Sequence, residues 1–278
     1  MNSNIKKILL KIIIGILATL WLIITGIPFL FMILSSFKKQ SDMFTKGLFS
    51  MPDSLYLDNF IEVFKGNILD YFLNSVIVLV ISLSILLFIS ACAAYPLSRF
   101  KFKLNKPIYA VIVAAMAVPI HVTLLPIFLM ATKTGLYDSI WALIGPYIAF
   151  NLPISIFILT TFMAQIPKEL EEAAQIDGCN RFRIFRSLML PLSKPGLATL
   201  AIYNSVNMWN EFSFVLVLTQ SQPNRTLPLA IWEYQGQYTL NIPMIMTVLT
   251  ISTIPMIIAF IIGQDKLIKG MMVGAVKG

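Results

Sequence analysis

A short polar segment between two long apolar runs carries the densest chemistry in the sequence. Residues 165–191 hold three glutamates, two adjacent alanines, an Asp-Gly pair and a closing Leu-Pro pair. Pro167 followed by glutamates is typical of the first turn of a helix, because proline loses no needed hydrogen bond there and carboxylates complement the positive helix end. Gly178 is typical of the residue that ends a helix. One face of this predicted helix, by i, i+3, i+4, i+7 spacing, carries Leu170, Ala173, Ala174 and Asp177.

This predicted helix suits contact with another protein. Alanines allow a close approach to a groove, and Glu172 beside them can pair with a basic side chain at the rim of that groove. A second short helix is expected from about Asn180, with arginines interleaved with phenylalanine and isoleucine. An amphipathic hairpin lying on a membrane surface has a similar composition, so the residues alone leave docking and membrane association both open.

Polar side chains also interrupt the apolar run that follows. Asn204 and Asn207 are expected to share a helix face with Asn210 or Glu211. Glu211 is the one acid inside a predicted span, where an ionisable group costs about 2.5–3.5 kcal/mol, so it is a functional candidate. Amides and carboxylates bond sugar hydroxyls, and aromatic rings pack on sugar rings. The residues predicted to line a translocation path are Tyr203, Asn207, Asn210 and Glu211. Hydrogen bonding between helices is the alternative role.

Other chemistry is sparse. His121, between Pro119 and Pro126, is a candidate proton relay. It has no acidic partner in its own run, so a structural role is favoured. Two cysteines are too few for a structural zinc site. No G-x-x-x-x-G-K-[ST] stretch is present. We therefore predict no catalytic residue, metal site or bound cofactor in this chain.

The elements that must position these residues are long apolar runs. A helix needs about 20 apolar residues to cross the hydrocarbon core. Six runs qualify, at about 12–34, 71–95, 108–130, 140–163, 196–218 and 243–263. They are too long and too continuously apolar for the strands of a membrane barrel. The sequence predicts an all-α integral membrane protein with six transmembrane helices in a single domain, residues 1–278.

Composition and charge give the expected environment and orientation. Only 12% of residues are charged, against about 25% in soluble domains, so we expect the bilayer to be the solvent. The net charge of +8 lies in the gaps between apolar runs, which indicates membrane topology instead of nucleic-acid binding. Fifteen of the 21 Lys and Arg residues fall in the N-terminal segment, the second gap, the fourth gap and the tail. We therefore expect both termini, and the 165–191 loop between spans 4 and 5, on the cytoplasmic side of the cell membrane.

The polar loop resembles a known motif. Glu172-Ala173-Ala174, Asp177-Gly178 and Leu188-x-Leu190-Pro191 are similar to the EAA loop of ABC importer permeases. In that family the loop forms a coupling helix that docks into the ATP-binding subunit. The residues to which the resemblance gives this role are Glu172, Ala173, Ala174, Asp177, Gly178, Leu190 and Pro191. The sequence departs mildly from the motif at Leu188, where isoleucine is frequent, and at Cys179, where alanine is common.

The resemblance extends over nearly the whole chain. Segments similar to the smaller six-span permease of maltose-type sugar importers are Pro28, 35–38, 57–60, 74–75, 94–95, 99–100, 209–210 and the tail 274–278. The implied partners are a second permease subunit, a dimer of ABC ATPase subunits that bind ATP and Mg²⁺, an extracytoplasmic sugar-binding protein, and membrane lipid. Nucleic acid is not an expected partner.

The predicted function is that of a permease subunit in an ATP-driven importer, carrying a di- or oligosaccharide by alternating access. The alternative is a secondary transporter driven by an ion gradient, with Glu211 or His121 as the coupling group. That alternative predicts inverted repeats with matching interrupted helices, and none is visible in the sequence. A membrane-embedded enzyme is disfavoured because it needs catalytic groups clustered at one depth.

Overall fold

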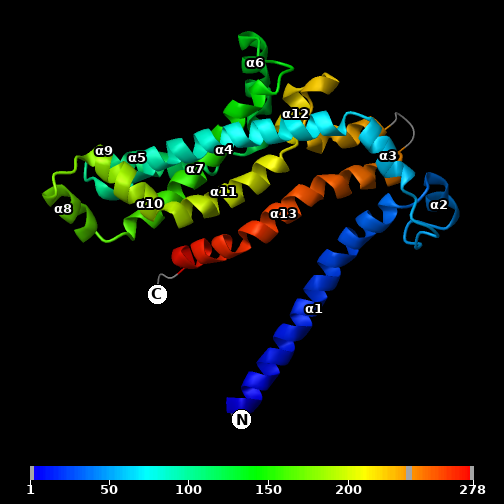
Figure 1. The fold of residues 1–278 in the computed structure, drawn as a ribbon, viewed down its shortest axis with the longest axis horizontal. Helices are drawn as coiled ribbons and strands as arrows, with labels where there is room; N and C mark the ends of the chain where they lie inside the picture. The colour runs from blue at the N-terminus through cyan, green and yellow to red at the C-terminus, as the bar shows by residue number, and fades with distance from the viewer. Residues whose placement is uncertain (1–2, 236–239, 276–278) are drawn as a thin grey trace. The chain divides into compact units, whose positions relative to one another are not determined.

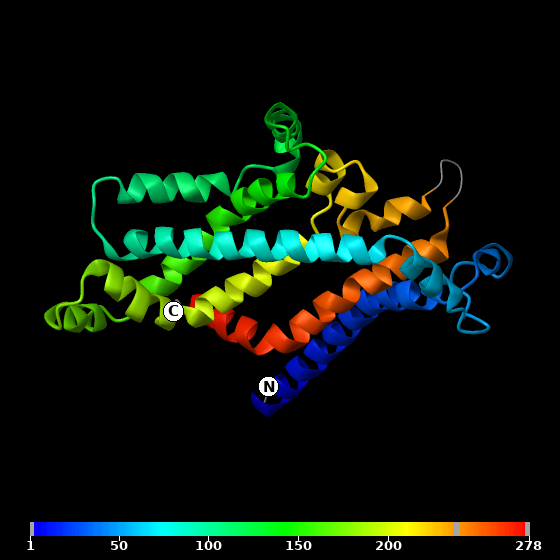
Figure 2. The same cartoon turned by 45° about the horizontal axis from the view of Figure 1, so that its top comes forward.

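The computed structural model describes residues 3–235 and 240–275. In these ranges the regular elements are helices, with one isolated antiparallel bridge between Gln235 and Leu240. The chain forms two compact units, residues 1–68 with 230–253, and residues 69–229 with 254–278 (Figure 1, Figure 2). The tail predicted to resemble sugar permeases lies partly outside the described residues, from Val276 to Gly278.

The first unit gathers around the end of α1 (Ser3–Ser36). It also contains α2 (Gln40–Thr45), α3 (Asp58–Lys65) and the start of α13 (Ile242–Ala275). The amide of Asn59 donates to the carbonyls of Ser36 and Lys38, each at 2.8 Å, and the Thr247 hydroxyl donates to Ser36 at 3.2 Å. These bonds satisfy carbonyls that the end of a helix leaves without partners. Hydrogen bonds therefore connect segment 35–38 directly to segment 57–60.

A buried lysine adds further hydrogen bonds beside this connection. The ammonium group of Lys38 donates to the Leu48 carbonyl at 2.9 Å and to the Ser50 hydroxyl at 3.4 Å. Burial lowers the pKa of Lys38, while the nearby Asp42 carboxylate acts in the opposite direction. The lysine thus connects the end of α1 to the irregular segment that follows α2.

The second unit surrounds α7 (Trp141–Ala164), which packs against α5 (Asn105–Ala115) and α11 (Lys194–Trp209). Its other helices are α4 (Ile68–Arg99), η1 (Ile120–Thr123), α6 (Leu124–Thr134), α8 (Glu169–Ile176), α9 (Arg181–Ile184), the π-helix η2 (Phe185–Met189), α10 (Leu190–Leu192), α12 (Ser213–Leu218), η3 (Gln222–Asn224), part of η4 (Leu227–Tyr234) and the end of α13. A Cβ atom added at Gly196 would lie 2.9 Å from the Phe162 ring. A glycine is therefore what allows α11 to approach α7 this closely.

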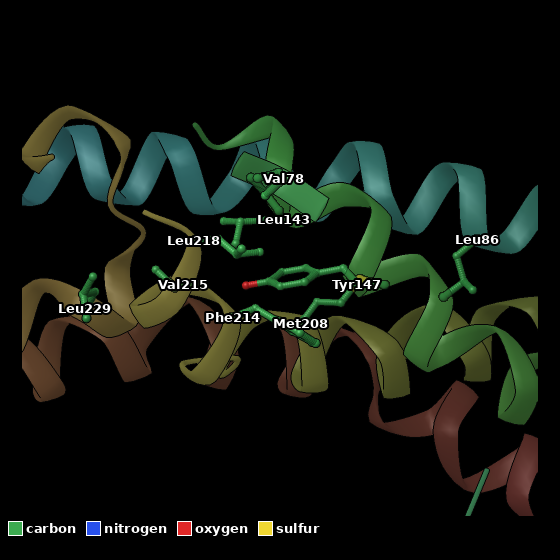
Figure 3. Packing of buried hydrophobic residues seen from close by; sticks show 11 residues of the cluster. Val78, Leu86, Leu143, Tyr147, Met208, Phe214, Val215, Leu218 and Leu229 are labelled. Carbon is green, nitrogen blue, oxygen red and sulfur yellow. The ribbon is translucent and has the colours of Figure 1, made fainter. Parts of the chain in front are cut away.

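The core of the second unit is apolar and lies between α4, α7, α11 and α12. Figure 3 shows Val78, Leu143, Met208 and Phe214 gathered around the Tyr147 ring. All five side chains are nearly or fully buried. This core holds together the helices on which the polar residues of the predicted path lie.

Four helices of the described chain are long and apolar enough to cross a membrane: 7–36, 68–99, 141–164 and 242–264. They contain the predicted runs 12–34, 71–95 and 243–263, and all but the first residue of the run 140–163. The run 108–130 is not one straight helix, because α5 and the helical stretch 120–134 meet at 92°. The structure therefore gives four spans, or up to five if the bent pair is one span, and six spans remain a prediction.

The predicted run 196–218 is also broken, between Trp209 and Ser213. The carboxylate of Glu211 accepts hydrogen bonds from the backbone amides of Phe214 at 2.9 Å and Val215 at 3.4 Å. A side chain that takes the first free amides of a helix stabilises its start. Hydropathy cannot detect this break, because the residues on both sides are apolar.

Asp138 joins two irregular segments in the second unit. Its side chain accepts from the amides of Gln220 and Ser221, each at 2.8 Å, and from the Ser221 hydroxyl at 3.0 Å. The amide of Asn224 donates to the Asp138 carbonyl. Burial opposes ionisation of Asp138, but these hydrogen bonds outweigh it and lower the pKa of its carboxyl group. Asp138 has a φ of 57°, in the left-handed region that aspartate and asparagine tolerate best.

We expect Asp138→Ala to lower the free energy of unfolding by about 2–3 kcal/mol, because several hydrogen bonds to a charged acceptor are lost and alanine is strained at positive φ. Thermal unfolding of the purified protein in detergent measures the change. Asp138→Asn keeps an acceptor and tolerates the backbone conformation, so it should lose less. Because the folded-state pKa is depressed, the native stability should also decline as the pH falls through it. Equal stability of the alanine variant and the native chain would contradict this role.

Candidate docking loop and polar stripe

The polar loop folds into two short helices joined by a tight turn. α8 ends at Ile176, and Gly178 adopts a φ of +79°. The amides of Gly178 and Cys179 donate to the carbonyls of Gln175 at 3.0 Å and Ala174 at 2.9 Å. A glycine at positive φ with such bonds is a common way to end a helix. The structure thus forms the predicted helix and places Gly178 in the predicted turn. Pro167, predicted in the first turn, instead lies two residues before α8 begins.

The second helix begins where the sequence indicates. The Asn180 side chain accepts from the Arg183 amide at 2.9 Å, which caps the start of α9. α9 continues through η2 and α10 toward α11, with only Ser193 between α10 and α11. The loop is therefore connected to α11 by an almost unbroken helix. We call the predicted polar residues on and just after α11 the polar stripe: Tyr203, Asn204, Asn207, Asn210 and Glu211.

A buried ion pair attaches α8 to the end of α4. The Nε atom of Arg99 lies 2.6 Å from the Glu171 carboxylate, and both side chains are almost completely buried. The guanidinium group also donates to the Ile166 carbonyl at 2.6 Å. The Tyr95 hydroxyl also interacts with the same carboxylate. Removing one partner of such a pair costs about 3–5 kcal/mol, because the other charge is left buried.

Aromatic rings hold α9 at the same place. The Tyr95 ring stacks on Phe185 at 5.3 Å and meets Phe100 edge-on at 5.2 Å. The Arg181 guanidinium lies over the Phe100 ring at 4.7 Å, a cation–π contact. The end of α4 thus holds both helices of the loop, and Figure 1 and Figure 2 show α8 and α9 beside it.

The other side of the loop is open. Among the residues predicted to dock, those exposed are Glu172, Ala173, Asp177, Gly178 and Pro191. Ala174 and Leu190 are half-buried and pack against the cluster around Tyr95. Ile176 is 86% exposed and Phe182 is 70% exposed. Large apolar side chains beside exposed acids are typical of a surface that another protein covers.

The pair that holds the loop is not predicted from the sequence. There, Arg99 counts as a topology signal and Glu171 as a charge that complements the helix end. Both residues belong to segments that the sequence singles out, but they are distant along the chain, so their pairing has no local signal. The structure adds Arg99 and Glu171 to the candidate site as residues that position α8.

The structure divides the predicted polar stripe between two faces of α11. Tyr203, Asn207 and Asn210 are exposed on one face. Asn204 is fully buried, and its amide donates to the Ser155 hydroxyl of α7 at 2.9 Å and to the Leu200 carbonyl at 2.9 Å. Asn204 therefore bonds between helices, which is the alternative role considered for this stripe.

Two further candidates lie at breaks between helices. Glu211 is half-buried, and its carboxylate interacts with the Tyr147 hydroxyl as well as with the amides of α12. It adjoins the exposed Asn210, so it stays beside the three exposed residues. His121 is exposed, in η1 at the bend between α5 and α6.

Comparison with known proteins places this architecture in a family. Residues 86–273 match the family described as binding-protein-dependent transport system inner membrane component. The chain is 54% identical over 263 residues to "Putative ABC transporter permease protein ORF2" of Caldicellulosiruptor sp. (strain Rt8B.4), covering 95% of this chain and 96% of that one. It is 33% identical to "Trehalose/maltose transport system permease protein MalG" of Thermococcus litoralis, covering 98% and 99% of the two chains.

A solved structure shares the fold. A chain of a bacterial ABC transporter that imports the acidic polysaccharide alginate superposes with a TM-score of 0.80 at 20% identity, covering 95% of this chain and 98% of that one. The matched residues of the family include the docking loop, the end of α4 that holds it, and the polar stripe. The chain therefore belongs to the binding-protein-dependent transport system inner membrane components, among the carbohydrate-type permeases of ABC importers.

Proposed function

We propose that this chain is the permease subunit of an ATP-driven importer that moves a di- or oligosaccharide across the cell membrane by alternating access. α8 couples the chain to a separate ATPase subunit. The observation that carries the proposal is the docking loop, which is fixed to α4 by a buried ion pair while Glu172, Ala173 and Ile176 remain uncovered. Kinship with sugar permeases supports the substrate class.

The loop is built to transmit displacement. Because Arg99 and the aromatic rings hold α8 and α9 against α4, a push on the exposed face moves the end of α4 with it. The helical connection through η2 and α10 carries the same displacement into α11. Closure of an ATPase dimer would thus change the arrangement of helices around the path.

The proposed role of this chain implies that other subunits supply the remaining steps of transport. The chain contributes coupling and part of a path, and its ATPase partners supply the nucleotide chemistry with ATP and Mg²⁺. A second permease completes the path, and an extracytoplasmic binding protein delivers the sugar, in keeping with the family's description as binding-protein-dependent. Both termini and the docking loop lie in the cytoplasm.

Within the membrane, we assign the sugar contacts to the exposed face of α11. Asn207 and Asn210 offer amides for hydroxyl groups, and Tyr203 offers a ring for the apolar face of a sugar. Glu211 contributes an acceptor at the end of this face and fixes the start of α12. A half-broken helix at this point suits a path, since irregular backbone at membrane depth is tolerated where it lines a cavity.

The exposed acid of α8 gives a direct test of docking. In Glu172→Lys we expect the amount of ATPase that co-purifies with the permease to fall by at least about tenfold, which corresponds to about 1.4 kcal/mol. Sugar uptake should be lost while membrane insertion is unchanged. Glu172→Asp, which keeps the charge at the same position, is the matched control and should keep most of the binding. Full ATPase binding and uptake in Glu172→Lys would refute the docking role.

The buried pair tests transmission. Arg99→Gln and Glu171→Gln should each release α8 from α4, since each leaves a buried charge without its partner, at a cost of about 3–5 kcal/mol. Hydrogen exchange across residues 165–191 should accelerate, and ATP hydrolysis should uncouple from sugar uptake. The double variant Arg99→Gln/Glu171→Gln, which leaves no unpaired charge, should be less damaged than either single variant. Strictly additive effects would argue against a coupled pair.

The path assignment is tested by uptake in assembled transporters. Asn207→Leu should reduce sugar uptake by about tenfold, because a hydrogen bond of about 1–1.5 kcal/mol to the sugar is lost. Glu211→Leu should reduce sugar uptake further. Glu211→Gln keeps an acceptor for the α12 amides, so lost uptake in this variant would indicate a sugar contact and not a loss of helix capping. Val206→Leu, on the same exposed face but without a polar group, tests whether added bulk alone lowers uptake. Normal uptake in both leucine variants at Asn207 and Glu211 would exclude these residues from the path.

A further inference from the structure

A basic cavity adjoins the docking loop, at the turn between α4 and α5. Its volume is about 810 Å³. Four lysines line it: Lys101, Lys103, Lys106 and Lys168. No carboxylate is among the described residues that line this cavity, and Arg99 in its wall is already paired with Glu171. The cavity thus presents several uncompensated positive charges around a space large enough for a polar headgroup.

The chemistry of this cavity fits a phosphate group. Lysine ammonium groups bind phosphate oxygens as point charges, and several arranged around one space favour an anion of more than one negative oxygen. Asn105 and Ser98 add hydrogen-bonding groups to the same lining. A neutral sugar has no charge to match such a surface, so we separate this site from the path on α11.

The surroundings of the cavity favour a lipid as the source of that phosphate. Phe102, which lines the cavity, is 41% exposed, and the neighbouring Leu104 is 61% exposed. The cavity lies where the long apolar helix α4 ends and α5 begins. An anion that also carries acyl chains can contact both the lysines and these exposed apolar side chains, whereas free phosphate can contact only the lysines.

We propose that this cavity binds the phosphate-bearing headgroup of an anionic phospholipid, and that the bound lipid touches the base of the docking loop. The proposal rests on the cytoplasmic orientation assigned above. Two lining residues reach the loop directly: Arg99 holds Glu171 of α8, and Lys168 immediately precedes α8. Lipid composition would therefore adjust how firmly α8 is held, in addition to the coupling itself.

The test compares the lipid that native and variant transporters retain, each assembled with all of its subunits. Complexes purified from nanodiscs containing equal phosphatidylglycerol and phosphatidylcholine are examined by native mass spectrometry, which reads lipid and ATPase content in one spectrum. In Lys101→Gln/Lys103→Gln/Lys106→Gln, we expect the ratio of bound phosphatidylglycerol to phosphatidylcholine to fall by at least about tenfold, because each lysine near an anionic lipid raises affinity by roughly fivefold.

Two variants serve as controls. The matching triple arginine variant keeps the charges and should keep the lipid, while Lys7→Gln/Lys11→Gln removes charges outside the cavity and should lower the ratio much less. Three results would overturn the proposal: a native ratio in the triple glutamine variant, an equal fall in the Lys7/Lys11 control, or displacement of the lipid by millimolar inorganic phosphate. If the native complex selects phosphatidylglycerol but contains no ATPase subunit, the proposed function is refuted and the lipid site still stands.

Discussion

The ion pair between Arg99 and Glu171 is the interaction on which the candidate site depends. It holds α8 against α4 at a point where few apolar contacts are available, because α8 is a short helix with most of its surface exposed. A buried charge pair is a weak source of net stability, but it is specific in geometry, since misplacing either partner is costly. Tyr95 completes the arrangement by interacting with the carboxylate and stacking on Phe185. One short segment of α4 thus determines where both helices of the loop lie.

A second constraint comes from the bilayer. Backbone groups in hydrocarbon must find partners within the protein, so each break in a span has to be satisfied locally. At the break after α11, the Glu211 carboxylate takes the amides that start α12. Near the start of α4, the Asn74 amide donates to the carbonyls of Pro223 and Arg225, and the Ser75 hydroxyl accepts from the Leu227 amide. These bonds join α4 to the segment around η3 and the start of η4. Such bonds explain why polar residues appear at isolated positions of an otherwise apolar sequence. They also weaken the case for Glu211 as an ion-coupling group, because its carboxylate is already engaged.

Much of the helical architecture follows from hydropathy, and local capping signals located the turn at Gly178 and the start of α9 at Asn180. These features depend on neighbours in sequence, so a single chain reveals them. Proline residues within the run 108–130 permit the 92° bend between α5 and α6, but they do not fix its angle. The break at Glu211 is local and has no hydropathy signal. The hydrogen bonds of Asp138 were not predicted, since they join residues more than 80 positions apart. The same reason applies to Arg99 and Glu171. For the polar stripe, spacing grouped Asn204 with Asn207, but packing against Ser155 places Asn204 on the buried side.

The π-helix η2, between the docking loop and α11, has a geometric consequence for the proposed path. A π-turn accommodates one residue more than an α-turn, and neighbouring α-helical residues are rotated by about 100° around the axis. The face that α11 presents is therefore set by the length of η2. Removing one residue from η2 while the loop stays in place would bring Ser205 into the buried position of Asn204 and turn the exposed amides away from their present direction. The number of residues in η2 therefore ties the rotation of α11 about its axis to the position of the loop.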